Sequence, residues 1–277
     1  MTKYLNKDTQ VCMSLAARPS NFGTRFHNYL YDALDLDYLY KAFTTKDIQA
    51  AIGGVRALGI RGCAISMPFK EDVIPLVDEM DASAKAIDSV NTIVNTDGHL
   101  KAYNTDYLAI AQLLAQYAVS NDQVFALRGS GGMAKAVACA LKDAGFKRGY
   151  IVAKNEKTGQ QLAALYGYEW RADMQGVTAE VLINATPIGM SGGADADKLA
   201  YSEDEIDRAN VIFDVVALPS ETPMIRYAKT QGKTVISGAE VFAIQAVEQF
   251  VLYTGIRPDH ELFLAAAKYA RESASKG

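Results

Sequence analysis

Residues 127–137 read LRGSGGMAKAV and place three glycines and one serine between an apolar run and an alanine-rich run. The preceding residues QVFALR predict a strand, and the residues from Met133 onward predict the first turn of a helix. Glycines in such a turn adopt backbone angles that a Cβ forbids and let a bulky anion approach the main chain. Free N–H groups and the positive end of the helix dipole favour a pyrophosphate there. The stretch therefore predicts a strand, turn and helix that bind a dinucleotide.

A glycine pattern alone is weak, because glycine-rich turns also make plain connections between strands and helices. Here a second strand, GYIVA, follows about 20 residues later, as in a dinucleotide-binding unit. That strand ends at Ala153-Lys154-Asn155, where an NAD enzyme usually carries an acid that binds the ribose and repels a 2′-phosphate. Lys154 supplies the opposite charge and favours NADP. Glu156 leaves NAD open, because a turn shifted by two residues brings this carboxylate to the ribose.

The composition is that of a folded globular protein. The chain has 277 residues, of which 49% are hydrophobic, enough for two modest domains or one large one. Its 28 basic and 32 acidic residues give a net charge of −4, without the basic excess that a nucleic-acid-binding surface needs. Cys12, Cys63 and Cys139 lie far apart in apolar segments, which indicates core residues rather than a zinc site or a disulfide framework. We expect a small-molecule partner, with monomer and homodimer both open.

No segment predicts export or membrane insertion. The first residues, MTKYLNKDTQ, are too polar for the apolar centre of a secretory signal. A run of about 18 apolar residues that could cross a bilayer is also missing. We therefore expect a soluble protein of the cytoplasm with no membrane partner.

Strand-like and helix-like segments alternate along the chain. Strands are predicted at QVCMSLA, DYLYKAF and GCAISM, and helices at FGTRFHNYLYDAL and TKDIQAAIGGVRAL. The segment VNTIVNTDGHLKAYN predicts an antiparallel hairpin, because Asp97-Gly98 separates two apolar-rich arms. After the amphipathic helix TDYLAIAQLLAQYAV, five short apolar runs predict parallel strands buried on both faces: QVFALR, GYIVAK, EVLINAT, NVIFDVV and KTVIS.

The end of the chain needs a surface to pack on. From AEVFAIQAVEQFVLYTG onward, two helices and no strand are predicted. We therefore predict a two-domain α/β protein. Residues 1–105, completed by 239–277, form a substrate-binding and catalytic domain, and residues 106–238 form a Rossmann-type, doubly wound parallel sheet that binds NADP.

Polar side chains gather in three stretches outside the glycine-rich domain, each at a predicted strand end or turn. They are SMPFK at 66–70, VNT at 90–92 and YNTD at 103–106. Each has a plain structural explanation by itself, since Lys70 can be a surface lysine, Asn91 a strand-edge residue and Asp106 a helix cap. Together they provide a lysine, a carboxylate and two amides that can converge on a small hydroxylated substrate beside a nicotinamide.

A lysine and a carboxylate can perform the proton transfer that such a reaction needs. Oxidation of a secondary alcohol requires a base for the O–H proton while a hydride leaves the carbon. A partly buried lysine can take that proton, and a neighbouring carboxylate can orient the amine. No metal is needed.

Short motifs along the whole chain occur in the order and roughly the spacing of one enzyme family. They are PFK at 68–70, VNT at 90–92, NTD at 104–106, GSGGMA at 129–134, NATPIGM at 184–190, DVVALPSETPMI at 214–225 and Gln245-Ala246 before FVLYTG. No single motif is specific, but the combination is. By that combination the sequence resembles the shikimate dehydrogenase family over nearly its whole length.

The resemblance implies an NADP-dependent oxidoreductase of aromatic amino acid biosynthesis that acts on a CH–OH group. Such an enzyme interconverts shikimate, or a closely related cyclic polyol carboxylate, and its 3-dehydro form, with Lys70 and Asp106 as the catalytic pair. The residues implied to bind substrate are Asn21, Ser66, Asn91 and Gln245. Those implied to bind the cofactor are Gly129, Ser130, Gly131, Gly132, Met133, Ala134, Lys154, Asn155, Thr186 and Gly238, within a site lined by 184–190.

The sequence departs from the family pattern where the substrate carboxylate is held. The family usually carries a Ser-x-Ser pair before the first helix, and alignment on Phe26-His27-Asn28 puts Asn21 and Gly23 at those positions. Gly23 has no side chain to donate. Arg18 and Arg25 flank this loop, and Arg18 is the better candidate to replace the lost contact because its segment is loop-like.

Two other family motifs are altered. Asn-x-Thr before PFK is Ala64-Ile65-Ser66 here, and Asn-Arg-Thr at the ribose is Ala153-Lys154-Asn155. The catalytic pair is kept, so we expect a shikimate dehydrogenase-like paralogue with altered or weakened substrate recognition. A quinate or aminoshikimate type of dehydrogenase shares the same pair, and a nucleotide-binding regulatory paralogue with little turnover is a third possibility.

Overall fold

The computed structural model describes residues 5–272, and the chain divides into two compact units. The N-terminal unit contains the chain up to Thr105 together with the chain from Gln245 onward. The central unit is Asp106–Ile244. The second boundary lies inside a helix, later than the return at residue 239 that the sequence predicts.

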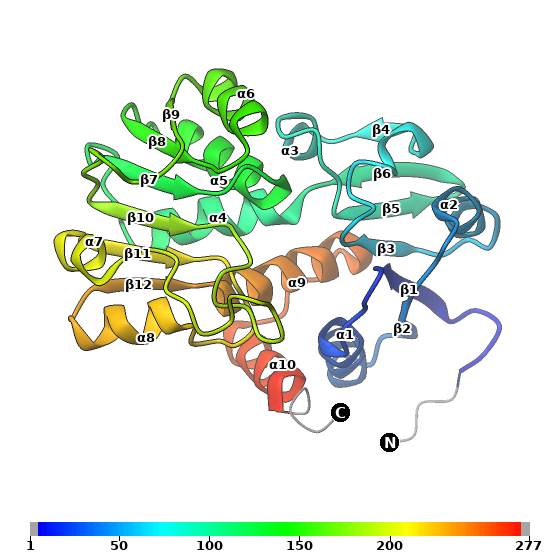
Figure 1. Ribbon diagram of the computed structural model, residues 1–277. Coiled ribbons are helices and arrows are strands. Elements are labelled where there is room, and N and C mark those ends of the chain that lie inside the picture. The colour runs from blue at the N-terminus through cyan, green and yellow to red at the C-terminus, as the bar shows by residue number, and fades with distance from the viewer. Residues whose placement is uncertain (1–4, 273–277) are drawn as a thin grey trace. The chain divides into compact units, whose positions relative to one another are not determined.

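A six-stranded mixed sheet in the order β2-β1-β3-β5-β6-β4 forms the N-terminal unit (Figure 1). The strands β2, β1 and β3 are parallel, β5 is antiparallel to both β3 and β6, and β4 is parallel to β6. The strands are β1 Gln10–Leu15, β2 Tyr38–Phe43, β3 Gly62–Ile65, β4 Glu79–Met80, β5 Thr92–Thr96 and β6 His99–Tyr103. The helices are α1 Phe22–Ala33, α2 Ile48–Ala57, a 3₁₀ turn at Ile74–Leu76, α3 Ala82–Lys85 and α10 His260–Glu272.

The hairpin predicted at Asp97-Gly98 is confirmed. Both residues have positive φ, 51° and 88°, as the tight turns that match strand twist require. Thr96 and His99 face each other at the first step of the β5–β6 ladder. β4 was not predicted, because a two-residue edge strand of one charged and one apolar residue has no hydrophobic periodicity.

The two faces of this sheet are packed differently. One face carries an aliphatic core that includes Leu15, Ile52 and Ile65, all almost fully buried. The other core is aromatic and contains His27 stacked on Tyr40 with ring centroids 4.3 Å apart. Phe26, Tyr31, Phe250 and Tyr253 surround the imidazole at centroid distances of 5.5, 6.0, 6.2 and 5.8 Å.

His27 is fully buried without a polar partner among the described residues. Neither ring nitrogen has a hydrogen-bond partner. Burial disfavours the charged imidazolium and lowers the pKa of His27 to about 3. His27 lies within the predicted helix FGTRFHNYLYDAL, but only the packing of α1 against its neighbours shows that its ring is a neutral core group.

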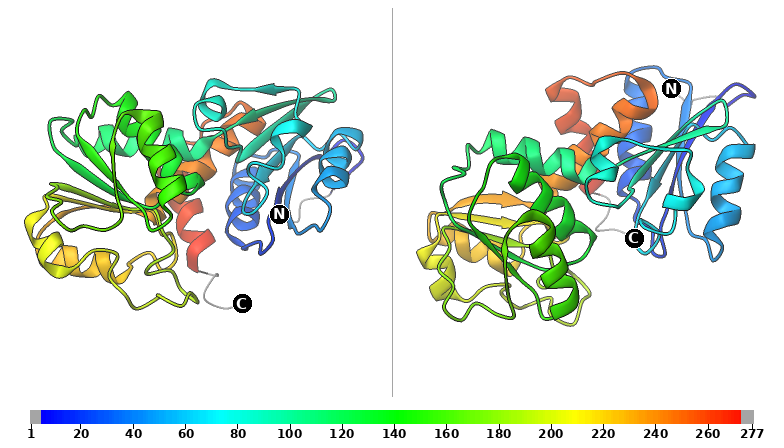
Figure 2. Two further views of the ribbon diagram at one scale, coloured as in Figure 1. Left: turned by 45° about the horizontal axis from the view of Figure 1, so that its top comes forward. Right: turned by 90° about the horizontal axis from the view of Figure 1, so that it is seen from above.

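The central unit has a six-stranded sheet in the order β12-β11-β10-β7-β8-β9, and every strand pair is parallel (Figure 1). The strands are β7 Phe125–Arg128, β8 Gly149–Val152, β9 Glu169–Arg171, β10 Val181–Asn184, β11 Val211–Asp214 and β12 Thr234–Ser237. The helices between them are α5 Gly132–Asp143, α6 Glu156–Tyr166, α7 Glu203–Arg208 and α8 Pro223–Thr230. Further views show helices packed along this sheet (Figure 2).

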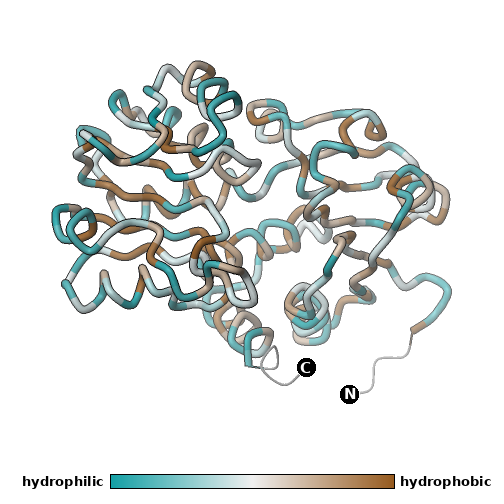
Figure 3. The backbone as a smooth tube through the Cα atoms, in the orientation of Figure 1, coloured by the Kyte–Doolittle hydropathy of each residue, from teal (hydrophilic) through white to brown (hydrophobic). Residues whose placement is uncertain are grey.

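This strand order confirms the predicted Rossmann-type, doubly wound sheet. β7-β8-β9 extend to one side and β10-β11-β12 to the other, so the winding reverses between β7 and β10. The strands run through hydrophobic stretches of the chain, as expected for a sheet that is covered on both faces (Figure 3). The five predicted parallel strands are present, and β9 was missed because EWR is a short, partly exposed edge strand.

Two helices carry the chain across the unit boundaries, α4 Thr105–Gln116 and α9 Gly238–Thr254. In the central unit, the hydroxyl of Tyr117 donates to Glu240 Oε1 over 2.6 Å. Glu240 also accepts from the main-chain N–H and the hydroxyl of Ser237. The hydrogen bond between Tyr117 and Glu240 therefore links the residue after α4 to the first turn of α9. Within residues 5–272, none of the helices combines the length and apolar character needed to span a membrane.

We predict that His27 makes the protein sensitive to acid. The unfolded chain takes up a proton on this residue below its ordinary pKa of about 6.5, whereas the folded chain does so only near pH 3. Stability from this group is therefore complete above pH 6.5 and is lost as the pH falls. Urea denaturation at several pH values should show His27→Phe losing less stability with falling pH than the wild type, by about 1 to 1.4 kcal/mol per pH unit at most.

The exposed His260, at the start of α10, provides the control. His260→Gln should keep the acid dependence of the wild type. Equal acid dependence in His27→Phe and the wild type would contradict the assignment.

Candidate active site

The glycine turn brings two loops of the central unit into close contact. Gly129 has φ 124°, and a Cβ on it would lie 2.9 Å from the carbonyl oxygen of Ala185. A larger residue is excluded both by conformation and by space. The ends of β7 and β10 are therefore held together at the position where the winding of the sheet reverses.

The start of α5 has no capping side chain. Gly131 is its N-cap, and within residues 5–272 the helix has no side-chain cap hydrogen bond. A Cβ on Gly131 would meet no atom within 4 Å, so the space beside the turn is open. Unpaired N–H groups, the positive end of a 12-residue helix and open space fit the phosphates of a dinucleotide.

A buried carboxylate organises the loops after β10 and β11. Asp214 Oδ1 accepts from Asn184 Nδ2 over 3.0 Å and from Val216 N over 3.1 Å, and its Oδ2 accepts from the Thr222 hydroxyl over 2.6 Å. Asn184 Oδ1 in turn accepts from the N–H and hydroxyl of Thr186. Burial raises the pKa of Asp214 to about 6, against the lowering effect of these hydrogen bonds.

The loop after β8 carries the predicted ribose-binding residues. Lys154 is exposed, and Asn155 caps α6 by accepting from Thr158 N over 3.1 Å. The hydroxyls of Ser130 and Thr158 are 2.7 Å apart and hydrogen-bonded, which joins the glycine turn to α6. Asn155 is therefore engaged as a helix cap, while Lys154 presents its charge to solvent.

Gly238, a predicted cofactor residue, begins α9. A Cβ on it would lie 2.4 Å from the main chain of Val216. Close packing of α9 on the segment after β11 explains why this position is glycine.

In the N-terminal unit, hydrogen bonds link three of the polar stretches singled out in the sequence. Val90 N donates to the carbonyl oxygen of Lys70 over 2.9 Å. The next residue, Asn91, is fully buried and accepts from Thr105 N and from the Thr92 hydroxyl, both over 2.8 Å. Asn91 thus fixes the start of α4 beside the Lys70 main chain, and Asp106 is the residue that follows Thr105.

Gln249 is a buried contact that the sequence analysis missed. Its Nε2 donates to the Thr92 hydroxyl over 3.0 Å and anchors α9 to the start of β5. The predicted substrate residue Gln245 lies one helical turn earlier and is partly exposed. Spacing of four residues puts both amides on one face of the helix, which is the signal that could have revealed Gln249.

The start of α1 also lacks a capping side chain. Asn21 is the N-cap residue, is exposed, and makes no side-chain bond to the first turn. A Cβ on Gly23 would lie 3.4 Å from the Tyr40 hydroxyl, an ordinary contact distance. Arg25 stacks over the ring of Tyr269 at 4.3 Å and is thus used in packing.

Comparisons with known proteins agree with this geometry. Residues 22–93 match the family model described as shikimate dehydrogenase substrate binding domain. The chain is 59% identical over 267 residues to a shikimate dehydrogenase-like protein of Haemophilus influenzae, covering 96% of this chain and 98% of that protein. It is 35% identical to shikimate dehydrogenase (NADP(+)) of Streptococcus uberis, over 88% of this chain and 90% of that protein.

The chain belongs to the shikimate dehydrogenase family.

A solved structure shows the same fold with its ligands. Shikimate 5-dehydrogenase of Thermus thermophilus, in complex with NADP(H) and shikimate, superimposes with a TM-score of 0.84 at 25% identity, over 94% of this chain and 99% of that one. The resemblance seen in the sequence is thereby confirmed. The roles assigned above to single side chains stay predictions.

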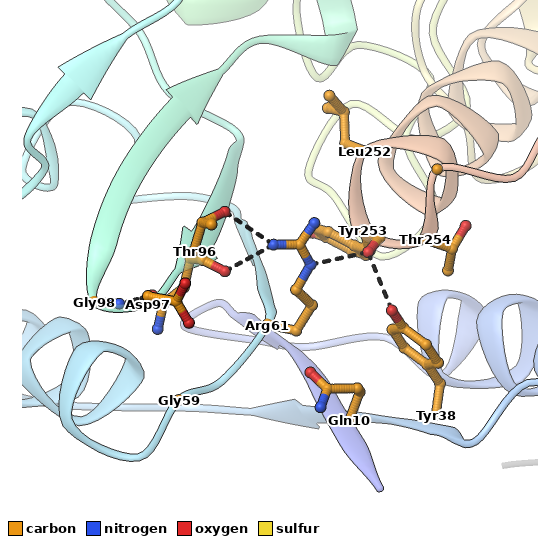
Figure 4. A pocket seen from close by; sticks show the side chains of 12 residues that line it. Gln10, Tyr38, Gly59, Arg61, Thr96, Asp97, Gly98, Leu252, Tyr253 and Thr254 are labelled. Carbon is orange, nitrogen blue, oxygen red and sulfur yellow. Dashed lines mark hydrogen bonds between the residues drawn. The ribbon is translucent and has the colours of Figure 1, made fainter. Parts of the chain in front are cut away.

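The N-terminal unit of this family member also contains a polar cavity of about 550 Å³ (Figure 4). It lies at the opposite ends of β1 and β3 from Ser66, the residue that follows β3. Gln10, which begins β1, and Arg61, which precedes β3, line it. Arg61 donates to the carbonyl oxygens of Tyr253 and Asn95 over 3.0 and 2.9 Å, and so ties α9 to the β5–β6 hairpin. The guanidinium at the centre of this cavity therefore has a structural role.

We predict that Asp214 gives a pH dependence of the opposite sign to that of His27. The pKa of Asp214 is raised from 3.8 to about 6, so the folded chain holds a proton that the unfolded chain has already lost. Stability from this group is present below pH 4 and is lost as the pH rises toward 6. Asp214→Asn carries a neutral side chain at every pH. Between pH 4 and 6 the free energy of unfolding of this variant, relative to wild type, should therefore rise by about 1 to 1.4 kcal/mol per pH unit at most.

Urea denaturation at pH values between 4 and 7 measures this effect. Asp197→Asn, at an exposed position of the same unit, should show no such trend. A constant difference between Asp214→Asn and wild type over the whole range would show that the buried carboxyl does not titrate there.

Proposed function

We propose that this protein is an NADP-dependent dehydrogenase that interconverts shikimate, or a closely related cyclic polyol carboxylate, and its 3-dehydro form. The observation that carries the proposal is the glycine turn at the reversal point of the central sheet, combined with the lysine and carboxylate motifs of the family. Relatives named as NADP(+)-dependent shikimate dehydrogenases support it. A cytoplasmic location, and the choice between monomer and homodimer, stay predictions.

The central unit would hold the cofactor through its main chain. The open start of α5, with Gly129, Ser130 and Gly131, would bind the pyrophosphate. Lys154 would pair with the 2′-phosphate, which favours NADP over NAD. The loop from Asn184 to Met190, fixed by Asp214, would line the nicotinamide end. When bound, the nicotinamide supplies the hydride acceptor for the alcohol carbon.

Lys70 and Asp106 would carry the proton. During oxidation the Lys70 amine takes the proton of the substrate hydroxyl while the hydride leaves the same carbon, and in the reverse direction the ammonium returns it. Asp106 lies in the first turn of α4 and is only 2% exposed. Its carboxylate would orient the amine and share the transferred proton with it.

The substrate would be held by amides and by the start of α1. The uncapped N–H groups of α1 offer donors and a positive dipole end to a carboxylate. Asn21 and Ser66 are exposed at the ends of α1 and β3, and Gln245 is partly exposed on α9. The Oδ1 of Asn91 already accepts two hydrogen bonds and its Nδ2 donates to the Thr105 hydroxyl, so it would act through its second Nδ2 hydrogen.

Lys70→Met should lower kcat by about 10²–10⁴-fold, the usual contribution of a positioned proton-transfer group. NADP affinity should change little, because Lys70 is in the N-terminal unit and the phosphate-binding turn is in the central one. Turnover is followed by the absorbance of the reduced nicotinamide, and affinity by calorimetry. Lys85→Met, an exposed lysine of the same unit, is the control. A Lys70→Met enzyme with most of its turnover would remove this residue from the mechanism.

Gly23→Ser should improve the binding of shikimate. The added Cβ fits, and the hydroxyl stands in the first turn of α1 where the family places a serine. One hydrogen bond to a charged group contributes about 1.5–3 kcal/mol, so KM should fall by roughly ten- to a hundredfold with little change in kcat. Gly53→Ser, at an open helical position of α2, controls for a general effect of the substitution. An unchanged KM would place the carboxylate elsewhere.

The altered positions Gly23 and Ala64 favour two further candidates. A quinate or aminoshikimate dehydrogenase would use the same proton-transfer pair on a differently substituted ring. A regulatory paralogue would bind NADP and turn over little. Assays of wild-type protein with NADP or NAD against shikimate, quinate and aminoshikimate separate them, because tight cofactor binding without turnover on any of the three supports only the regulatory candidate.

A further inference from the structure

Arg128 is a cation at the ligand-binding edge of the central sheet to which the sequence analysis gave no role. It is the last residue of β7 and immediately precedes Gly129. Its side chain is partly buried, and its Nε is buried without a hydrogen-bond partner. The guanidinium carbon lies 4.6 Å from the ring centroid of Tyr201.

Tyr201 is a fixed platform for this guanidinium. Its side chain is 1% exposed, and its hydroxyl lies 2.8 Å from the carbonyl oxygen of Ala126 and 2.9 Å from that of Ile183. These carbonyls belong to β7 and β10, the two strands between which the winding reverses. The ring is thus fixed against the two strands at whose carboxyl ends doubly wound sheets bind their ligands.

Some other arginines of the chain are paired with carboxylates. Arg56 bonds to Asp78 over 2.7 Å, and Arg257 to Glu248 over 2.8 Å. In residues 5–272, Arg128 has no such ion pair; its contact is the face of Tyr201. A partly buried cation without a counter-ion is unfavourable unless an anion completes its environment.

We propose that Arg128 binds a phosphate group of the dinucleotide cofactor, with Tyr201 holding the guanidinium plane in position. The inference rests on the proposed function, because it assumes that the central unit binds such a cofactor. Arginine suits the task, since its planar guanidinium can stack on an aromatic ring and still direct N–H groups at phosphate oxygens. The phosphate is either the pyrophosphate or the 2′-phosphate. The two alternatives predict different effects of an Arg128 substitution on NAD binding, because NAD lacks the 2′-phosphate.

The test compares cofactor affinities of wild type, Arg128→Met and Lys154→Met, measured by calorimetry with NADP and with NAD. Methionine keeps the length and packing of the arginine stem but removes the charge. Arg128→Met should weaken NADP binding roughly ten- to hundredfold, the effect of losing a charge-assisted hydrogen bond. An equal loss for NAD assigns the pyrophosphate, and unchanged NAD binding assigns the 2′-phosphate. Lys154→Met should weaken NADP alone.

Two further measurements keep the result interpretable. Arg128→Lys keeps the positive charge but lacks the planar guanidinium, so it should recover part of the NADP affinity that Arg128→Met loses. Thermal unfolding without cofactor checks that each variant is folded. Wild-type affinity for NADP and NAD in a folded Arg128→Met protein overturns the proposal while leaving the proposed function intact. Failure of the wild-type protein itself to bind either nucleotide overturns both.

Discussion

The close approach of Gly129 to the carbonyl oxygen of Ala185 is the constraint on which the central unit depends. Only a residue without a Cβ and with a positive φ can occupy that position. The contact joins the ends of β7 and β10 through main-chain atoms, at the position where the winding of the sheet reverses. The start of α5, whose N-cap Gly131 has no capping side chain, follows directly in the chain.

Buried polar side chains hold the loops that follow the strands of this sheet. Asp214 connects Asn184 to Thr222 and thereby couples the loops that follow β10 and β11. The N-terminal unit uses the same principle, since Asn91 fixes the start of α4 through Thr105. Burying these polar groups costs desolvation free energy, but all their hydrogen bonds can form in only one arrangement of each loop. That requirement positions functional side chains more accurately than apolar packing does. The raised pKa of Asp214 is the physical sign of that cost.

The proposed proton transfer and the proposed binding of the substrate carboxylate depend on different segments of the chain. Proton transfer would use the region fixed by Asn91, where buried hydrogen bonds determine the backbone. The substrate carboxylate would bind at the start of α1, where Asn21 is exposed and Gly23 offers no side chain. A few substitutions at an exposed helix start can change which ring substituents are held without disturbing the buried hydrogen bonds. If these proposed roles hold, the separation would let a family member keep its catalytic motifs while its specificity changes.

The sequence by itself determined the α/β architecture, the hairpin at Asp97-Gly98 and the strand, turn and helix around Gly129. These features come from signals within a few residues, namely apolar periodicity and the conformational freedom of glycine. Only the tertiary structure decided the rest. β4 and β9 exist because longer neighbours pair with them, and the bond from Gln249 to Thr92 joins residues 157 positions apart. Arg128 and Tyr201 meet for the same reason. Long-range packing brings together side chains that are far apart in the sequence, and no local sequence signal predicts their contact.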